Sequence, residues 1–289
     1  MRNVNKDNIT EVFMGYLSED TDPRLREVMS SMVRHLHAFA REVNLTHEEW
    51  NIGIQFLERA GEISDEERHE FVLLSDVLGL SSLVDMLNNR PEGTSSSVLG
   101  PFHITGSPPL AVGGDMRRDY TETVLLVEGV VKDPDGNPIP GATLDIWQTA
   151  PNGMYSSQDP DQDTYSFHGL QTVGEDGRYA FTTVKPIEYT VPADGPVGDI
   201  LRACGRHPWR PSHLHFIAEA EGFRPLVTEV FAEDDPYLDE DTVFGVREDL
   251  VMRYEDKPAG TFPESGFALS GNVPDAYLRV EFDLTLVPA

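Results

Sequence analysis

Short runs of strand-forming residues, separated by glycine and proline turns, occupy the sequence from residue 123 onward. The runs cover residues 123–133, 141–149, 178–184, 213–220, 226–232 and 277–287. Valine, threonine, leucine and aromatic residues are common in them, and such residues fit a half-buried pleated strand. Because no helical pattern of similar length lies between the runs, a βαβ sheet is disfavoured. The sequence therefore predicts a mainly antiparallel β-sandwich, and the Asp135-Gly136 turn between the first two runs predicts a hairpin.

The sequence before residue 90 follows a helical period instead. Over residues 22–44 the apolar side chains recur every three or four positions, and Pro23 stands early, where a helix accepts proline. Thr46 and Glu49 have the spacing of a capping box, which predicts that a second helix begins there. Two shorter helices are expected, over residues 66–78 and 82–87.

Together the two patterns predict an α+β protein. A stretch rich in glycine, proline and serine follows Asn89, so the composition changes there. We expect a helical region over residues 1–100 and a β-sandwich domain over residues 101–289. The apolar stripe of residues 22–44 is expected to pack within the same chain, and a surface for a partner is the alternative.

The charge balance limits the partners. Aspartate and glutamate number 50 against 22 lysines and arginines, so the formal net charge is -28 and the pI is about 4.5. Such a surface repels phosphate backbones and anionic lipid headgroups, so we expect no nucleic acid partner and no membrane insertion. Cys204 is the single cysteine, which excludes an intrachain disulfide. With neither a signal-peptide pattern nor a long apolar segment, the protein is expected to be cytoplasmic.

A long loop is expected over residues 233–276. It contains the acidic run EDDPYLDEDT at residues 233–242. The run lacks the D-x-D-x-D-G order of an EF-hand, so we interpret it as a solvated surface segment rather than a calcium site.

Two histidines stand one residue apart in the run 213–220. Side chains alternate between the two faces of a strand, so His213 and His215 point to the same side and Leu214 to the other. Imidazoles so placed can bind one metal ion, although two ordinary strand histidines would give the same pattern. With Cys204 as the single thiol, structural zinc is disfavoured. No carboxylate stands at a recognisable ligand spacing, which disfavours a ferrous site of two histidines and one carboxylate.

Two tyrosines lie near strand ends. Tyr155 follows Gly153, which permits a tight turn just past the run 141–149, and Tyr189 lies between Pro186 and Pro192. Taken singly, each tyrosine is better explained as a core or interface residue.

The order of these residues resembles the intradiol ring-cleavage dioxygenases. Trp147-Gln148 precedes Tyr155, Tyr189 follows, and then comes Arg210-Pro211-x-His213-x-His215. The segment GVVKDPDGNPIPGATLDIWQ is also similar to that family, and the resemblance extends from the N-terminal helices to about Phe244. It implies an enzyme with one non-haem Fe(III) ion per subunit, held by Tyr155, Tyr189, His213 and His215. Ferric iron prefers anionic oxygen donors, and a bound cation makes the tyrosine phenolate accessible at neutral pH.

The resemblance also implies catalytic roles for two residues. Arg210 would stabilise the negative charge that develops on the aromatic ring as O2 attacks. Tyr189 would act in turn as a metal ligand and as the base that accepts a substrate proton. Without the motif, Arg210 would be taken as the partner of a surface carboxylate.

Within the family, the sequence looks most like the group that cleaves hydroxyquinol, benzene-1,2,4-triol. The segments at residues 83–89 and 98–103 carry this similarity. The resemblance implies that Asp85 accepts a hydrogen bond from the third hydroxyl group, and a solvated helix residue is the alternative. It further implies a ring pocket lined by Val98, Leu99, Gly100, Val191, Pro192 and Val243. Ser82 stands where a bulkier apolar residue is expected, and His168 has no role in the family pattern.

The expected reaction converts the triol and O2 to 3-hydroxy-cis,cis-muconate, which is maleylacetate in its keto form. A catechol or chlorocatechol 1,2-dioxygenase is the alternative within the family. A non-catalytic transthyretin-like module is the alternative outside it, because those modules share the G-x-V-x-D-x-x-G-x-P-I-x-G-A pattern. The resemblance also implies a homodimer formed through the N-terminal helices, with a phospholipid held in an apolar groove there.

Overall fold

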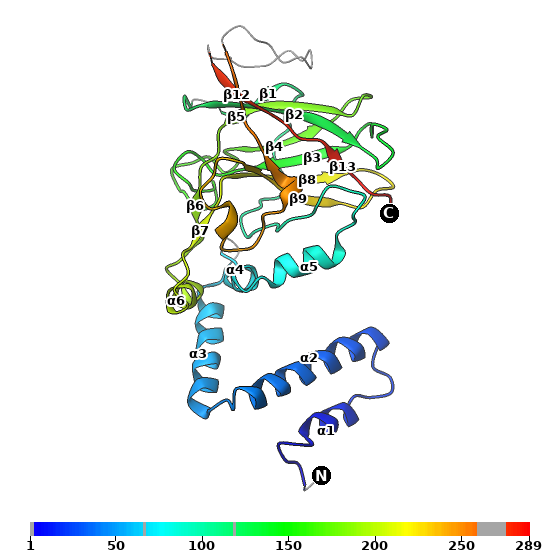
Figure 1. Ribbon diagram of the computed structural model, residues 1–289, viewed down its shortest axis with the longest axis vertical. Coiled ribbons are helices and arrows are strands. Elements are labelled where there is room, and N and C mark those ends of the chain that lie inside the picture. The colour runs from blue at the N-terminus through cyan, green and yellow to red at the C-terminus, as the bar shows by residue number, and fades with distance from the viewer. Residues whose placement is uncertain (1–2, 66–67, 118–119, 259–275) are drawn as a thin grey trace. The chain divides into compact units, whose positions relative to one another are not determined.

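The computed structural model describes residues 3–65, 68–117, 120–258 and 276–289. The chain forms two compact units, Met1–Arg59 and Ala60–Ala289. Helices make up the first unit, and the described strands lie in the second unit (Figure 1). The division at residue 100, which rests on composition, stays a prediction.

The first unit contains α1 (Ile9–Gly15), α2 (Pro23–Glu42) and most of α3 (His47–Ile63). Asp22 caps α2, because its carboxylate accepts a hydrogen bond from the Leu25 amide at 2.9 Å. The capping box at the start of α3 is confirmed: Glu49 Oε2 accepts from the Thr46 amide at 2.8 Å, and Thr46 Oγ1 accepts from the Glu49 amide at 3.2 Å. Helix α1 was not predicted, because its seven residues are too few for a clear period.

Three more helices belong to the second unit. They are α4 (Glu70–Val77), α5 (Leu80–Asn88) and α6 (Pro196–Ala203). Gly79 separates α4 from α5 and has φ of 73°, a left-handed conformation that favours glycine. The buried carboxylate of Glu70 accepts from the Val197 amide at 2.9 Å and so ties α4 to the first turn of α6. The sequence predicted α4 and α5 but not α6.

Two sheets and one short ribbon hold the strands. The larger sheet contains β1 (Gly114–Asp115), β2 (Val124–Lys132), β5 (Arg178–Val184), β11 (Glu255–Lys257), β12 (Tyr277–Glu281) and β13 (Leu284–Thr285), in the order β1-β5-β2-β12-β11, with β13 also on β2. The other sheet contains β3 (Thr143–Trp147), β4 (His168–Thr172), β8 (His213–Glu219), β9 (Leu226–Ala232) and β10 (Val251–Met252), in the order β10-β9-β8-β3-β4. The ribbon pairs β6 (Tyr189–Thr190) with β7 (Trp209–Arg210).

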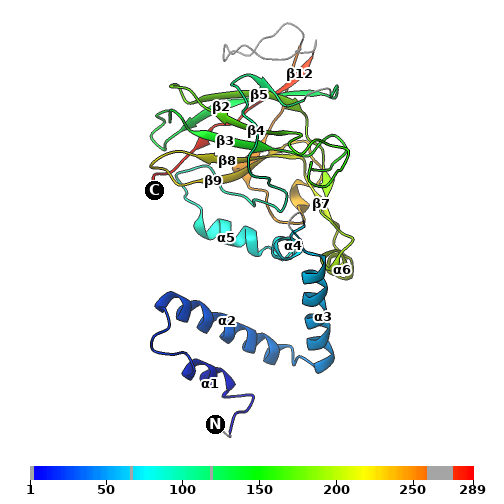
Figure 2. The same ribbon diagram turned by 180° about the vertical axis from the view of Figure 1, so that it is seen from behind.

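The two sheets pack face to face, which confirms the predicted sandwich (Figure 1 and Figure 2). Leu125, Val127 and Phe181 from the larger sheet meet Leu214 and Phe216 from the other in one buried core cluster. The pairs β2·β5, β3·β4, β3·β8 and β8·β9 are antiparallel, while β12 and β13 run parallel to β2. Helices α4 and α5 lie on the side of β8 and β9 that faces away from β2 and β5 (Figure 2).

The predicted hairpin at Asp135-Gly136 is wrong, although the turn itself forms. The Asp133 amide donates to the Asn137 carbonyl at 2.9 Å, and Gly136 has φ of 85°. Beyond the turn, β2 and β3 enter different sheets. Pro138 and Pro140 lack the amide hydrogens that a continued ladder between the two strands would need.

The expected last strand and the expected long loop are both interrupted. The run 277–287 breaks into β12 and β13 at Asp283, whose carboxylate accepts from the Val130 amide and from Lys132 Nζ. The segment 233–276 was expected to be a loop, but it includes two short 3-10 turns, Leu238–Glu240 and Glu248–Leu250, and strands β10 and β11. Its residues 259–275 lie outside the described residues. Among the described helices, none has the length and apolar character needed to cross a lipid bilayer.

Candidate metal centre

The outer face of the β8 sheet carries the two predicted histidines. Leu214 and Phe216 point into the sandwich core, so the alternation places His213 and His215 on the opposite face, as expected. In the strand register, His215 is the direct neighbour of Trp147 on β3 and of Glu229 on β9. The Trp147 ring stacks on His215 at a centroid distance of 4.6 Å and an interplanar angle of 2°. The flat contact fixes the plane of the His215 ring.

The two tyrosines reach this face from separate elements. Tyr155 follows the turn at Gly153, which has φ of 78°, and its ring stacks on Phe102 at 4.9 Å. Tyr189 lies on β6 and is paired in register with Arg210 on β7. Both tyrosine rings are buried, and they meet edge to face at 5.4 Å.

The four predicted ligands converge on one small volume. Tyr155 Oη lies 3.3 Å from Tyr189 Oη, 3.3 Å from His213 Nε2 and 3.0 Å from His215 Nε2. The two Nε2 atoms are 3.1 Å apart. Two ligands about 2.1 Å from one ion and about 90° apart are themselves about 3 Å apart. The spacing therefore suits four atoms that share one cation.

The protonation of these groups also fits a cation. His213 Nδ1 lies 2.7 Å from the Pro211 carbonyl oxygen, which can only accept, so Nδ1 carries the proton and Nε2 presents a lone pair. Burial lowers the pKa of His213 to about 3, helped by the Arg210 cation, and burial also lowers the pKa of His215. Burial raises the pKa of both tyrosines. Neutral imidazoles therefore face phenols that need a nearby cation to ionise.

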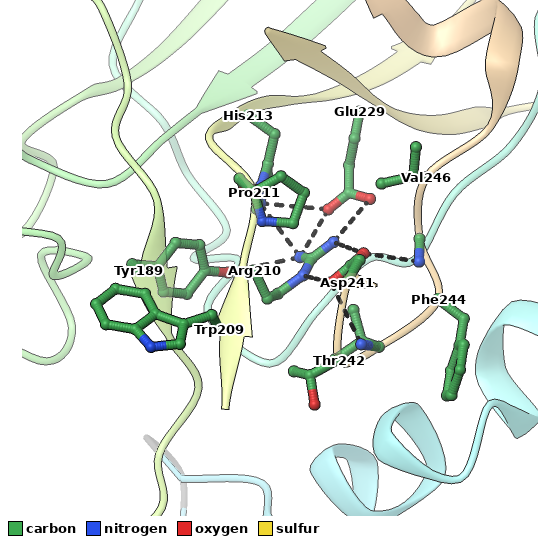
Figure 3. Close-up of polar contacts among 12 residues, drawn as sticks. Tyr189, Trp209, Arg210, Pro211, His213, Glu229, Asp241, Thr242, Phe244 and Val246 are labelled. Carbon is green, nitrogen blue, oxygen red and sulfur yellow. Dashed lines mark hydrogen bonds and ion pairs between the residues drawn. The ribbon is translucent and has the colours of Figure 1, made fainter. Parts of the chain in front are cut away.

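A buried cation, Arg210, stands beside two of the four donors, Tyr189 and His213 (Figure 3). Arg210 Nη1 lies 3.2 Å from His213 Nε2 and 3.5 Å from Tyr189 Oη. Asp241 holds the guanidinium through Nε at 3.1 Å and through Nη2 at 3.2 Å, and Glu229 holds it through Nη1 at 2.8 Å and Nη2 at 3.2 Å. Arg210 thus lies where its charge acts on the cluster, and its counterions are buried carboxylates rather than surface ones.

Glu229 is the site residue that the sequence analysis missed. No carboxylate stands at a recognisable ligand spacing in the sequence, yet the fold brings Glu229 Oε1 to 3.3 Å from His213 Nε2 and 3.5 Å from His215 Nδ1. Within the described residues, His213, His215 and Glu229 form a group whose ligand atoms lie within 4.8 Å of one another. A single charged residue in the middle of the otherwise uncharged run LVTEVFA suggests a buried functional carboxylate. Only the pairing of β8 with β9 shows that this carboxylate lies beside His215.

The acidic run at 233–242 is only partly a surface segment. Asp241 and Thr242 are buried, and Asp241 accepts from the Gly245 amide at 2.8 Å as well as from Arg210. A Cβ atom on Gly245 would lie 2.7 Å from Arg210 Nη2 and 2.8 Å from Glu229 Oε2. The prediction of a solvated stretch is therefore wrong at its C-terminal end, where the chain closes over the arginine.

The predicted pocket residues occupy several places. A cavity of about 760 Å³ is lined by Tyr189, Val191 and Pro192, together with Phe102 and Trp209. Gly100 lies beside the cluster, since a Cβ there would come 3.8 Å from His215 Cε1. Val98 and Val243 are buried, and Leu99 is exposed. Asp85 lines a smaller cavity of about 220 Å³, yet it is near enough to Glu229 and Arg247 for their charges to act on its pKa.

Two residues that departed from the expected pattern have clear positions. Ser82 is buried, and its hydroxyl donates to the Phe244 carbonyl at 2.6 Å, so a bulkier apolar residue would lose this bond. His168 pairs with Trp147 across β3 and β4 and lies outside the four-donor cluster. Its ring nitrogens have no hydrogen-bond partner among the described residues, and burial lowers its pKa to about 4.

Several known proteins are similar to this chain. Residues 110–288 match a family described as "Dioxygenase", and residues 22–95 match one described as "Catechol dioxygenase N terminus". The chain is 46% identical over 271 residues to hydroxyquinol 1,2-dioxygenase of Nocardioides simplex, covering 93% of this chain and 90% of that protein. It is 42% identical over 290 residues to 6-chlorohydroxyquinol 1,2-dioxygenase of Cupriavidus pinatubonensis, covering 100% and 99%. The solved hydroxyquinol 1,2-dioxygenase from Pseudomonas putida DLL-E4 superimposes with a TM-score of 0.89 at 43% identity, covering 98% of this chain and 99% of that chain.

Proposed function

The chain belongs to the intradiol ring-cleavage dioxygenase family, and from this premise we propose that its substrate is benzene-1,2,4-triol. The protein is therefore an enzyme of a family that binds non-haem iron, and not a transthyretin-like module. In the proposed reaction the bond between the two adjacent hydroxyl-bearing carbons breaks, and both oxygen atoms of O2 enter the product. That product is 3-hydroxy-cis,cis-muconate, or maleylacetate in the keto form.

The convergence of Tyr155, Tyr189, His213 and His215 is the observation that carries the proposal. We propose that these four residues hold one Fe(III) ion per subunit, because two phenolates and two neutral imidazoles match its preference for anionic oxygen and imidazole donors. A ferric ion bound there would withdraw electron density from an aromatic diol and so open its ring to O2.

The protein's own groups then act on the substrate. Tyr189 lines the 760 Å³ cavity and is also one of the four clustered donors, so we assign its Oη the role of accepting a proton from a substrate hydroxyl group. Arg210 keeps a full positive charge beside Tyr189 Oη, because Asp241 and Glu229 outweigh the effect of burial and hold its pKa above the ordinary value. A fixed cation in a buried site stabilises negative charge as it develops on the ring.

The visible spectrum tests the function directly. We expect the iron-loaded protein to absorb in the visible through tyrosinate-to-iron charge transfer, and anaerobic addition of benzene-1,2,4-triol to shift that band. Initial rates with O2 should favour the triol over catechol. A colourless iron-loaded protein would refute the enzyme site, and faster turnover of catechol would instead support the catechol or chlorocatechol alternative.

We propose that Asp85 recognises the third hydroxyl group and that Val98, Leu99, Gly100, Val191, Pro192 and Val243 surround the ring. Asp85 is half-buried on α5, and burial raises its pKa to about 6. A half-buried carboxyl left without a partner by catechol would cost about 1–3 kcal/mol. Two features support this role for Asp85. The charge of Glu229 acts on its pKa, and α5, which carries it, lies beside the sheet that contains β8 (Figure 2).

Asp85→Asn tests this assignment. We expect the ratio of kcat/KM for the triol to that for catechol to fall about tenfold, the factor that about 1.4 kcal/mol provides. The catechol value is the internal control, because catechol lacks the hydroxyl group in question. An unchanged ratio would remove Asp85 from the substrate pocket.

We propose that a second copy of the chain covers α2. The expectation that the apolar stripe of residues 22–44 packs within the same chain is wrong for most of the stripe. Exposed at helical spacing are Leu25, Val28, Met32, Leu36, Phe39 and Val43. Such a stripe is larger than scattered surface apolar residues and marks an interaction surface, and methionine suits an adaptable groove for a phospholipid acyl chain. Light scattering and lipid extraction with mass spectrometry check both points, and a lipid-free monomer would contradict them. The expectation of a cytoplasmic protein stays a prediction.

A further inference from the structure

Glu229 is a buried carboxylate in the middle of β9. Its side chain has no solvent exposure, and its register neighbour on β8 is His215, so the two side chains share one face of the sheet. Burying a carboxylate is costly unless charged or hydrogen-bonding groups surround it. The partners of Glu229 therefore indicate what the residue does.

The groups around the Glu229 carboxylate are the Arg210 guanidinium, the Ser97 hydroxyl and the rings of the two histidines. Glu229 binds Arg210 with both oxygens, at 2.8 and 3.2 Å, and Oε2 also lies 2.5 Å from the Ser97 hydroxyl. Oε1 is at the same time 3.3 Å from His213 Nε2 and 3.5 Å from His215 Nδ1. One carboxylate oxygen thus faces the guanidinium and both imidazoles (Figure 3 shows its contacts with Arg210 and His213).

The second nitrogen of His215 needs an acceptor. His215 Nδ1 is buried and has no hydrogen-bond partner within the described part of the chain. When Nε2 of a neutral imidazole binds a metal ion, Nδ1 carries the proton and requires an acceptor. Glu229 Oε1 is a carboxylate oxygen 3.5 Å from this nitrogen. His213 differs, because its Nδ1 already has the neutral Pro211 carbonyl at 2.7 Å.

We propose that Glu229 is a positioning residue that accepts the Nδ1 proton of His215 and holds the Arg210 guanidinium in place with the same carboxylate. A carboxylate behind a ligating histidine fixes the ring and strengthens its donation to the metal. His215 is then the more strongly donating imidazole of the pair, and the metal centre and Arg210 keep a fixed separation. The inference rests on the proposed function only in taking the two histidines as metal ligands.

Asp241 offers a matched comparison. It is the other carboxylate on Arg210 and it is also buried. Among the described residues its hydrogen-bond partners are the guanidinium and the amides of Val243 and Gly245 rather than a histidine. Glu229→Gln and Asp241→Asn each remove one negative charge from the same arginine and keep the shape of the side chain. Only the first variant removes a charge beside His215.

Cobalt(II) binding, followed by ligand-field absorption, measures this difference without any turnover. We expect Glu229→Gln to weaken Co(II) affinity by about 10- to 100-fold and Asp241→Asn to leave it near the wild-type value. In the iron-loaded proteins, Glu229→Gln should shift the tyrosinate charge-transfer band, and Asp241→Asn should not. Equal affinities in the two variants, or equal band shifts, would overturn the proposal.

Thermal unfolding shows whether Glu229→Gln still folds. If it does not, Glu229→Asp provides a second test of the proposal. Glu229→Asp keeps the charge but draws the carboxylate back from His215, so it should also weaken Co(II) binding. Wild-type affinity in that variant would overturn the role assigned to the Nδ1 contact. If wild-type protein binds Co(II) as expected but does not cleave the triol, the proposed function fails while the role of Glu229 stands.

Discussion

Tyr189→Phe is expected to lower kcat by about 10²- to 10⁴-fold, the range that a positioned proton acceptor contributes. Tyr189 lines the 760 Å³ cavity and its phenol oxygen lies 3.3 Å from Tyr155 Oη, so removing this oxygen takes away the proposed base and a proposed iron ligand together. Stopped-flow turnover with benzene-1,2,4-triol and the visible spectrum of the resting protein measure the two losses.

A phenol outside the cluster provides the control for that variant. Tyr165 Oη donates to the Thr105 carbonyl at 3.1 Å, away from the four donors, so Tyr165→Phe should keep the wild-type spectrum and rate. Tyr189→Phe protein with an unchanged spectrum and rate would exclude Tyr189 from the metal centre.

Arg210→Met is expected to reduce both turnover and stability. The change leaves Glu229 and Asp241 buried without their shared cation, and breaking a buried ion pair by removing one partner costs about 3–5 kcal/mol. Turnover falls as well, because the charge beside Tyr189 Oη is lost. Urea denaturation and steady-state kinetics measure the two effects.

The stability of Arg210→Met should depend on pH in the direction opposite to the contribution that the ion pair makes in the wild-type protein. In the wild-type protein burial favours a higher Glu229 pKa, but Arg210 and its other neighbours hold the pKa below its ordinary value, so the stability that the pair contributes is lost as pH falls. Without Arg210, burial raises the pKa of Glu229, so the variant should become more stable as pH falls from 8 toward about 5. Arg279→Met, which breaks the pair with Glu128 elsewhere in the fold, is the control and should keep turnover. Equal stability of Arg210→Met at both pH values would contradict the buried-charge explanation.

Local pattern was enough to predict much of this protein. The period of residues 22–44 and the Thr46 capping box depend only on neighbouring residues, and both are confirmed. The alternation around Leu214 placed His213 and His215 on one face, which the core cluster confirms. The proposed ligand set required the family resemblance, because Tyr155 and Tyr189 are ordinary core tyrosines when each is considered alone.

Features that depend on long-range pairing could not be predicted in the same way. Glu229 lies beside His215 only through the β8·β9 register, and Asp241 reaches Arg210 only because the chain near Gly245 folds over it. The hairpin at Asp135-Gly136 failed for a related reason, since a good turn says nothing about which sheet the next strand joins.

Strand β8 serves the hydrophobic interior and the proposed iron centre with alternate residues. A slip of one residue in its pairing would send both imidazoles into the interior and turn Leu214 and Phe216 outward. A chain that has found its correct interior packing has thereby also set these two histidines on the opposite face, before any ion arrives. If the proposed centre holds iron, the iron that a purified preparation takes up under saturating supply is expected to track its natively folded fraction.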